Sequence, residues 1–401
     1  MVNYLNRYIL ITGGELFNKG AQAMTFITVD KMKEMFPDHE IIVFSHRDAN
    51  RSETEKENYR FKFMPFPNFG ESMSLITGLR RNFYQKKDVV NFKSYLNIFK
   101  NADLLLDISG YGIGSNWGIE KSRSYIRRIA VAKHFRIPMI ILPQSFGPFD
   151  YSGRFSWFIK NEISYYFKYP KLVMAREVDS FESIQSICPK CRVVKTYDMV
   201  LQNRQFCSDK IFVNQPIIRN LNIYQNSIAI IPNSKNNKYG NEEQIIELYK
   251  TIIERILSCG KKVYLIYHAY EDKSICLKIK EELYNNRSDV IYIPDELNCI
   301  EFEKIIGQFD FIIASRYHSI VHSYKQGVPA LIFGWATKYK ELASIFSQNQ
   351  YCFDVSSIGD IKVVLNSLDD LMLNHVIHSK KIIAKLKEIQ SQNIFDLISY
   401  D

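Results

Sequence analysis

Short apolar runs alternate with longer amphipathic segments along most of the chain, a pattern typical of an α/β fold. Helical periodicity separates many of the runs, most clearly over 121–135 and 242–258. Runs of strand length lie at 8–11, 41–44, 103–108, 139–142, 172–175, 192–195, 228–231, 263–267, 290–293, 310–314 and 328–334. Strands that alternate with helices form parallel sheets with crossover helices. The sequence therefore predicts parallel-sheet architecture throughout.

This alternation is interrupted twice. The rhythm is lost over 45–100, and it stops again over 201–226, where the chain turns polar and irregular. Domain boundaries favour such exposed polar segments. We therefore predict an N-terminal Rossmann-like domain at 1–200, a linker at 201–226, a C-terminal Rossmann-like domain at 227–375 and a helical segment at 376–401 that braces the domains. Two such domains facing a cleft describe a glycosyltransferase-B-like architecture, with ligands at the carboxyl ends of the strands.

The length of the chain agrees with a division into two domains, and its net charge limits the classes of ligand to be considered. A chain of 401 residues with 46% hydrophobic and 24% charged residues is globular and too long for one ordinary core. The formal net charge of +9 favours anionic partners, which include nucleic acid, lipid surfaces and acidic small molecules. From the strand-end motifs below, we expect a small-molecule substrate and no nucleic acid.

The cysteines and the hydropathy indicate the compartment. Seven cysteines at irregular spacing suggest reduced thiols. Cys188 and Cys191 have the spacing of half a zinc ribbon, but no second pair follows, so we expect structural thiols. No apolar run approaches the roughly 20 residues of a membrane-spanning helix. We expect a cytoplasmic protein, either free or at the inner face of the cell membrane, with no metal and no cofactor.

The stretch from Phe309 to Leu342 carries the strongest chemical signal. An apolar run ends at Ser315, and Arg316 and His318 then open a helix. A fixed cation and a titratable imidazole beside free backbone N–H groups suit an acidic ligand. Ser315 and Arg316 could hold phosphate or carboxylate oxygens while His318 transfers a proton. The alternative is that Arg316 pairs with an acidic residue and that His318 caps the helix or packs under Trp335.

Polar residues end other predicted strands in the same way. Each has a structural alternative: Arg176 could form a surface pair with Glu177 or Asp179, and the others could stabilise turns or satisfy backbone groups. In the functional interpretation, Arg176 faces Arg316 across the cleft and the remaining side chains hydrogen-bond a sugar or an anion. The candidates are Arg176, His268, Gln144, Ser145 and, beside the first glycine-rich turn, Asn18.

A segment rich in cations and aromatic residues, 79–87, has two interpretations. If it is helical, it could lie against an anionic membrane that carries lipid-linked acceptors. The alternative is a solvated surface with salt bridges.

Taken together, these motifs resemble the polysaccharide pyruvyl transferase family over roughly residues 9–342. The similarity rests on the order and strand-end placement of several short motifs. They are Gly13–Gly14 with Asn18–Ala21, 107–114, 142–149, Ala175–Glu177 with Ser180, 231–233, His268, and 315–318 with 327–329 and Lys338–Tyr339.

The resemblance implies transfer of a pyruvyl group from phosphoenolpyruvate, as co-substrate, to a sugar of a surface polysaccharide or its lipid-linked precursor, forming a pyruvate ketal. It also implies a glycosyltransferase-B-like fold without a metal requirement. Arg176 and Arg316 would bind the donor's phosphate and carboxylate, and His318 would be the catalytic acid or base. Gly14 and Lys338 match the family's motifs as further substrate-binding positions. Lys19–Ala21 departs from the family's usual residues, which leaves the handling of the acceptor open.

Two rival functions fit the same architecture. In a sugar transferase, Arg316 and the helix N-terminus would hold the pyrophosphate of a nucleotide-sugar donor. In a phosphosugar-binding regulator, the ligand would bind without forming a product, and only the basic net charge supports this hypothesis. Binding of phosphoenolpyruvate against nucleotide-sugars would separate the first rival from pyruvyl transfer.

Overall fold

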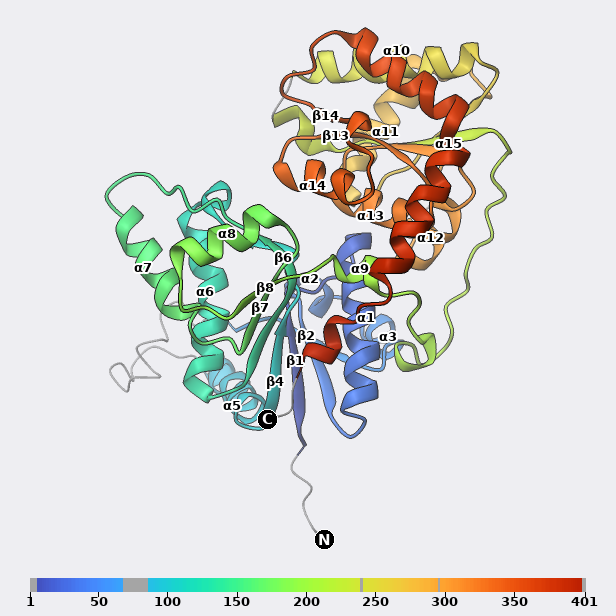
Figure 1. Cartoon of the computed structure of the whole chain (residues 1–401). Helices are drawn as coiled ribbons and strands as arrows, with labels where there is room; N and C mark the ends of the chain where they lie inside the picture. Colours follow the sequence, from blue (N-terminus) through green and yellow to red (C-terminus); the bar gives the residue numbers. More distant parts are fainter. Residues whose placement is uncertain (1–5, 68–85, 239–240, 295, 399–401) are drawn as a thin grey trace.

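The computed structural model describes residues 6–67, 86–238, 241–294 and 296–398. Figure 1 shows two domains, with the N-terminal part of the chain in blue to green below and the C-terminal part in yellow to red above. Each domain is built on its own parallel sheet. The predicted architecture of two parallel-sheet α/β domains is therefore observed.

The N-terminal sheet has the strand order β3-β2-β1-β4-β6-β7-β8, and β5 pairs with β6 off this path. Every paired strand is parallel to its neighbour. The bounds are β1 Tyr8–Thr12, β2 Glu40–Phe44, β3 Lys62–Met64, β4 Ala102–Asp107, β5 Tyr111–Ile113, β6 Met139–Phe146, β7 Leu172–Ala175 and β8 Val193–Lys195.

The C-terminal sheet has the order β11-β10-β9-β12-β13-β14 and is also parallel. Its bounds are β9 Ser227–Ile231, β10 Lys262–Leu265, β11 Val290–Tyr292, β12 Phe311–Ala314, β13 Ala330–Gly334 and β14 Cys352–Asp354. In both sheets the first strand in the sequence, β1 or β9, lies inside the sheet, and the strands that follow it extend first toward one edge and then toward the other. Ligand sites of open α/β sheets lie at such switch points, outside the carboxyl ends of the strands.

Helices connect the strands as crossovers. In the N-terminal domain they are α1 Lys19–Met35, α2 His46–Ala49, α3 Glu53–Glu57, α5 Lys86–Lys100, α6 Gly118–Phe135, α7 Ser156–Tyr166, α8 Val178–Ile187 and α9 Met199–Gln202. After them come α10 Glu242–Ser258, α11 Lys273–Lys278, α12 Cys299–Ile306, α13 Tyr317–Lys325, α14 Thr337–Ile345 and α15 Ile361–Ile389. Short helical turns lie at Ser115–Trp117, Ser208–Lys210, Ser234–Lys238, Tyr270–Asp272, Ile279–Leu283, Asn349–Tyr351 and Ile394–Leu397.

One hydrophobic core joins the domains. Alternate residues of β1 face opposite sides of the sheet, so Ile9 and Ile11 pack with α1 while Leu10 packs toward α6 and α7. The cluster around α1 continues into α12 and α13 of the other domain. Helix α15 starts in the C-terminal domain and runs down to the N-terminal one (Figure 1), where its last turns join the same cluster. The predicted boundary at residue 376 thus falls inside one continuous helix.

Polar contacts also cross between the domains. Lys19, which departs from the family's motif, is buried and its Nζ donates to the carbonyl of His268 at 3.0 Å. The neighbouring Asn18 forms a backbone bridge with Ala269. On the other side of the cleft, Glu341 of α14 accepts hydrogen bonds from the backbone N–H groups that begin α8, at 2.7 and 3.2 Å. These contacts hold the two sheets in one arrangement.

Several remaining sequence predictions can be placed. Cys188 and Cys191 are free and buried, and the Cys188 thiol donates to a backbone carbonyl. Within the segment 79–87, residues 79–85 lie outside the described residues, and Lys86 begins α5. Among the helices that are described, none is long and apolar enough to cross a membrane.

Candidate active site

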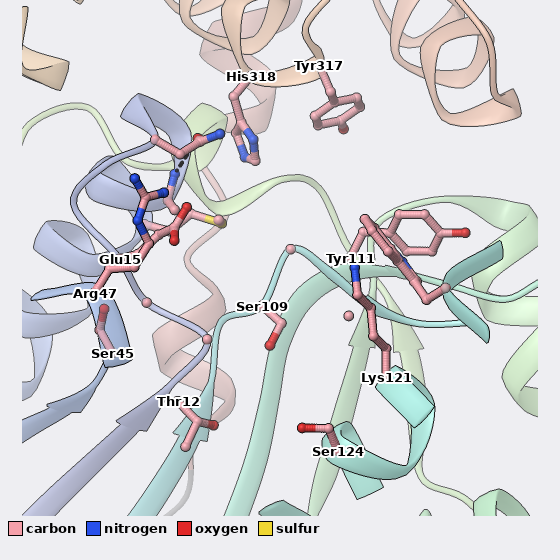
Figure 2. A pocket seen from close by; sticks show the side chains of 18 of the residues that line it. Thr12, Glu15, Ser45, Arg47, Ser109, Tyr111, Lys121, Ser124, Tyr317 and His318 are labelled. Atoms are coloured by element: carbon pink, nitrogen blue, oxygen red, sulfur yellow. Dashed lines mark hydrogen bonds between the residues drawn. The ribbon is translucent and has the colours of Figure 1, made fainter. Parts of the chain in front are cut away.

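A cavity of about 890 Å³ opens between the domains at the carboxyl ends of the strands. Its floor comes from the turns that follow β1 and β4 and from one side of α6, and its roof comes from α13 and α14. Figure 2 shows Tyr317 and His318 projecting into it from the C-terminal domain, with Ser109, Lys121 and Ser124 on the opposite side. Of the residues predicted from sequence, those that line this cavity are Gly14, Asn18, Arg176, His268, Arg316, His318 and Lys338.

Arg316 is held by carboxylates at the start of α13. Its Nε and Nη2 donate to the two oxygens of Asp272 at 2.7 and 2.6 Å, and Nη2 also donates to Glu271 at 3.0 Å. These carboxylates raise the pKa of Arg316 against the opposing effect of burial. Pairing with acidic residues, the sequence-based alternative for this arginine, is therefore observed. The pairing fixes the guanidinium at the cavity wall and leaves Nη1 without a hydrogen bond among the described residues.

Arg176 lies in a buried polar network at the end of β7. Its guanidinium donates to Glu177 and to Asp198 at 2.8 Å each, and to the Ser145 hydroxyl at 3.0 Å. It also lies 4.1 Å from the centre of the Tyr317 ring, from the facing domain. The surface pair considered from the sequence is corrected in two respects, because the pair is buried and its second carboxylate is Asp198 and not Asp179.

The two arginines therefore bring no excess positive charge. Each guanidinium contacts two carboxylates, so each cluster carries more negative than positive charge. The uncompensated cations of the donor side are Lys235 and Lys338, neither of which lies within ion-pair distance of a carboxylate in the described part of the chain.

Lys338 sits among aromatic rings in the first turn of α14. Its Nζ lies 5.0 to 5.6 Å from the ring centres of Tyr111, Tyr317, Trp335 and Tyr339. Burial, together with the nearby charge of Arg176, lowers the pKa of Lys338 to about 7. A lysine with this pKa holds its charge best when an anion lies beside it.

His318 is packed tightly against the N-terminal domain. A Cβ added to Gly20 of α1 would lie 2.2 Å from its imidazole, so only glycine permits this approach. Burial and the charge of Arg176 hold the pKa of His318 well below its usual value. The imidazole is therefore neutral at pH 7 and can accept a proton. Its Nε2 lies 3.6 Å from Asp198 Oδ2, which is too far for a direct hydrogen bond but close enough to stabilise a positive charge.

Asp198 links the two candidate groups, and the sequence interpretation missed it. One of its oxygens caps α9 by accepting from the N–H of Val200 at 2.9 Å, and the other accepts from Arg176 and faces His318. The available signal was its place just after the short strand at 192–195. The sequence prediction places Asp198 at the end of the N-terminal domain, just before the linker at 201–226, and assigns it no role.

His268 contributes a second neutral imidazole. It is 1% exposed, and both of its ring nitrogens lack a hydrogen-bond partner within the described residues. Burial and the charge of Lys19 keep its pKa well below the usual value. Asn18 already uses its side-chain oxygen to cap α1, accepting from Gly20 and Ala21.

Three predicted binding residues do not line the cavity. Gln144 is fully buried and donates to Asp107 and Tyr125. The Ser315 hydroxyl is hydrogen-bonded to Tyr249 behind α13, at 2.9 Å. Ser145 donates to Glu177 and lines a neighbouring cavity of about 550 Å³. Gln144 and Ser315 therefore support the wall of the site from the core, whereas Ser145 supports it by accepting from Arg176 at the wall of the neighbouring cavity.

The N-terminal wall carries charges that the sequence did not identify. Arg47, Lys121 and Arg127 line the cavity and have no carboxylate within ion-pair distance among the described residues, whereas Arg128 pairs with Asp107 at 2.8 Å. Glu15 lies close to Arg47 in Figure 2. Burial raises the pKa of the Glu15 carboxyl group. Within the residues that are described, no group of three or more His, Cys, Asp or Glu side chains could hold a metal ion.

Comparisons with known proteins give the family and the fold. The family model described as polysaccharide pyruvyl transferase matches residues 18–337. No curated protein sequence matches the chain. Among solved structures, the S. aureus MnaA–UDP complex is similar with a TM-score of 0.57 at 13% identity, covering 94% of this chain and 90% of that one.

Two further structures have the same fold. A putative UDP-N-acetylglucosamine 2-epimerase from Listeria monocytogenes has a TM-score of 0.56 at 10% identity, covering 98% of both chains. Medicago truncatula UGT71G1, complexed with UDP-glucose, has a TM-score of 0.53 at 11% identity, covering 98% of this chain and 95% of that one. The predicted glycosyltransferase-B-like fold is thus confirmed.

Proposed function

The chain belongs to the polysaccharide pyruvyl transferase family, and on that basis we propose that it moves the pyruvyl group of phosphoenolpyruvate onto a sugar and closes a cyclic ketal there. The observation that carries the proposal is the meeting of Arg316, His318 and Lys338 with Arg176 in one cavity between the domains. A small, highly anionic donor fits such a set of hydrogen-bond donors.

In the proposed site, some residues bind the donor through their positive charge and others through the fixed direction of their hydrogen bonds. Lys338 and Lys235 supply the uncompensated positive charge that offsets the donor's phosphate and carboxylate. Arg316, held rigid by Asp272 and Glu271, offers the N–H groups of its remaining nitrogen, Nη1, in a fixed direction. Arg176 keeps Asp198 and the Tyr317 ring in place and borders the same anion.

The proposed reaction requires a base that accepts a hydroxyl proton, and a neutral His318 can serve as that base. The imidazole takes the proton of the first acceptor hydroxyl, and a proton passes from it to the methylene carbon, which becomes a methyl group as the hydroxyl oxygen bonds to C2. C2 of an enol phosphate becomes electrophilic only as the methylene carbon is protonated, so the two events belong to one step. The second hydroxyl attacks C2 as phosphate leaves, and its proton departs with the phosphate. Asp198, 3.6 Å from Nε2, stabilises the transient imidazolium. A positioned acid/base contributes about 10²–10⁴-fold to such steps.

The cations on the N-terminal wall of the cavity favour an acceptor that carries phosphate groups. Arg47, Lys121 and Arg127 line the cavity from the N-terminal domain. Lys121 and Lys235 lie near the same Trp117 ring, so the basic wall adjoins the donor cations. A saccharide linked to a lipid through phosphate groups would place those groups against the cations and its sugar toward His318. We propose that the protein acts in the cytoplasm, free or at the inner face of the membrane.

The test is incubation with phosphoenolpyruvate and a panel of neutral aryl glycosides and lipid-phosphate-linked saccharides. Mass spectrometry would detect the ketal, and a phosphate assay would follow donor consumption. We expect the wild-type protein to form the adduct and His318→Ala to lose turnover while still binding the donor. Consumption of a nucleotide-sugar without phosphoenolpyruvate would favour the sugar transferase, and binding without product would favour the regulator.

A further inference from the structure

Helix α7 presents an unusual aromatic face at the outer edge of the N-terminal domain (Figure 1). Phe155, Trp157, Phe158 and Tyr165 are 46%, 67%, 52% and 54% exposed. We call these four residues the aromatic face of α7. Single exposed apolar residues are common on protein surfaces, but large aromatic residues gathered on one helix mark an interaction site.

The helical geometry separates this face from the core. Ile159 and Ile163 are fully buried and anchor α7 to the domain. Positions 157, 158, 161 and 165 project from the opposite side, because successive residues turn by about 100°. Trp157, Phe158 and Tyr165 are therefore not the exposed edge of a core packing surface, whereas Phe155, one turn before Ile159, borders that surface.

Cations surround the aromatic face. Arg154 lies over the Phe155 ring at 4.7 Å, and Lys133 lies over the Tyr165 ring at 3.8 Å. Lys160 and Lys168 are exposed on the same segment, whereas the carboxylate of Glu162 is used by Arg123. The local charge is thus positive, in agreement with the formal net charge of +9 for the chain.

We propose that the aromatic face of α7 docks the protein on an anionic lipid surface. Tryptophan, tyrosine and phenylalanine side chains insert at the level of the headgroups, and the surrounding lysine and arginine side chains contact anionic lipid phosphates. Each basic residue near such a surface is attracted by its negative potential, which decays within a Debye length. The proposal does not depend on the proposed pyruvyl transfer.

Vesicle sedimentation tests the proposal without any substrate. We expect the wild-type protein to pellet with phosphatidylglycerol-containing vesicles, and to pellet poorly with pure phosphatidylcholine or at high salt. Trp157→Ala with Phe158→Ala is expected to lower the partition coefficient by about tenfold or more, because it removes two inserting rings. Arg154→Glu with Lys160→Glu is expected to reduce binding to the anionic vesicles.

A matched control comes from α15, where Leu373 and Ile377 are 81% and 54% exposed. Leu373→Ala with Ile377→Ala removes two exposed apolar side chains elsewhere and is expected to leave vesicle binding unchanged. Circular dichroism of each variant would verify that it is folded.

Trp157 also provides a direct optical signal. The chain contains three tryptophans, so Trp117→Phe with Trp335→Phe leaves Trp157 as the sole indole. We expect its emission to shift to shorter wavelength when anionic vesicles are added. Absence of wild-type binding, or equal binding after Trp157→Ala with Phe158→Ala, would overturn the proposal. So would a lipid-free dimer that this double variant dissociates, because a second copy would then cover the face.

Discussion

At the scale of single residues, the carboxylates around the two arginines decide which cations of the cavity are available to an anionic donor. The two arginines that looked like the donor's counter-charges are each paired with two carboxylates, and Lys338 remains as a cation without one among the described residues. Sequence could identify Arg176 and Arg316 because they follow apolar strands. It could not identify their partners, because Asp272 is brought beside Arg316 by the strand order of the C-terminal sheet.

Lys338 makes donor binding depend on pH. Its pKa of about 7 lies below the ordinary 10.5, and a bound anion favours its charged form. We expect the KM for phosphoenolpyruvate to rise above about pH 7 by up to tenfold per pH unit as the ammonium loses its proton. Lys338→Arg, which stays charged, is expected to give a KM that is flat with pH. A wild-type KM that is equally flat would show that this lysine does not hold the donor.

The same shift has an opposite effect on the donor-free fold. Between about pH 7 and pH 10 the unfolded chain binds more protons than the folded protein at this position, so the free energy of unfolding rises with pH there. Denaturant unfolding of the wild-type protein and of Lys338→Met across that window would measure the difference.

Asp198 is expected to position both His318 and Arg176. Asp198→Asn keeps the shape but removes the charge that stabilises an imidazolium, so we predict a fall in kcat of about 10- to 100-fold with a smaller change in the donor's KM. Asp179→Asn is the matched control, since this carboxylate lies near Arg176 in sequence but does not pair with it. Equal losses in both variants, or an unchanged pH profile of kcat in Asp198→Asn, would contradict the assignment.

At the scale of elements, most strands follow from their apolar runs and their crossover helices. The missed strands β3, β5 and β14 span three residues each and lack the adjacent β-branched residues that mark the equally short β8 and β11. Helix α5 was missed although Val89, Phe92, Leu96 and Phe99 recur at helical spacing along it, because it lies in the stretch 45–100 where the alternation of strands and helices is lost. In contrast, many residues at the predicted strand ends do line the cavity, because the carboxyl ends of parallel strands lie at the same edge of a sheet.

The contact between α14 and α8 couples the donor residues of the two domains. Glu341 lies one turn after Lys338, and it caps the helix that begins directly after Arg176 and Glu177. We expect Glu341→Gln to weaken this cap by about 1 kcal/mol and to raise the donor's KM, because the two halves of the donor site separate more easily. Glu182→Gln serves as the control. Glu182 and Glu341 both line the cavity of about 550 Å³, but the side chain that accepts from the N–H groups of Val178 and Asp179 is that of Glu341. Identical KM values for the two variants would refute the coupling.

At the scale of the whole molecule, the site exists only where the domains meet. His318 reaches it by packing on Gly20 of the other domain, and the shared core around α1, α12 and α13 fixes that approach. Neither contact could be inferred from the sequence, because the relative placement of two domains leaves no local pattern.

Gly20→Ala tests whether this interdomain packing is required. Alanine in a helix is ordinarily better than glycine by about 1 kcal/mol, but here its Cβ would meet the imidazole at 2.2 Å. We therefore expect a strong loss of turnover with the N-terminal fold retained. Gly359→Ala, where a Cβ meets nothing within 4 Å, is expected to leave activity unchanged. Full activity in Gly20→Ala would mean that His318 need not lie where the structure has it.

The most direct test of the central claim is a paired product assay with phosphoenolpyruvate and a saccharide acceptor. The account predicts that the wild-type protein releases one phosphate for each pyruvylated saccharide seen by mass spectrometry, and that His318→Ala binds phosphoenolpyruvate but forms no ketal. Phosphate release without a pyruvylated product across the acceptor panel, or unchanged product formation by His318→Ala, would contradict it.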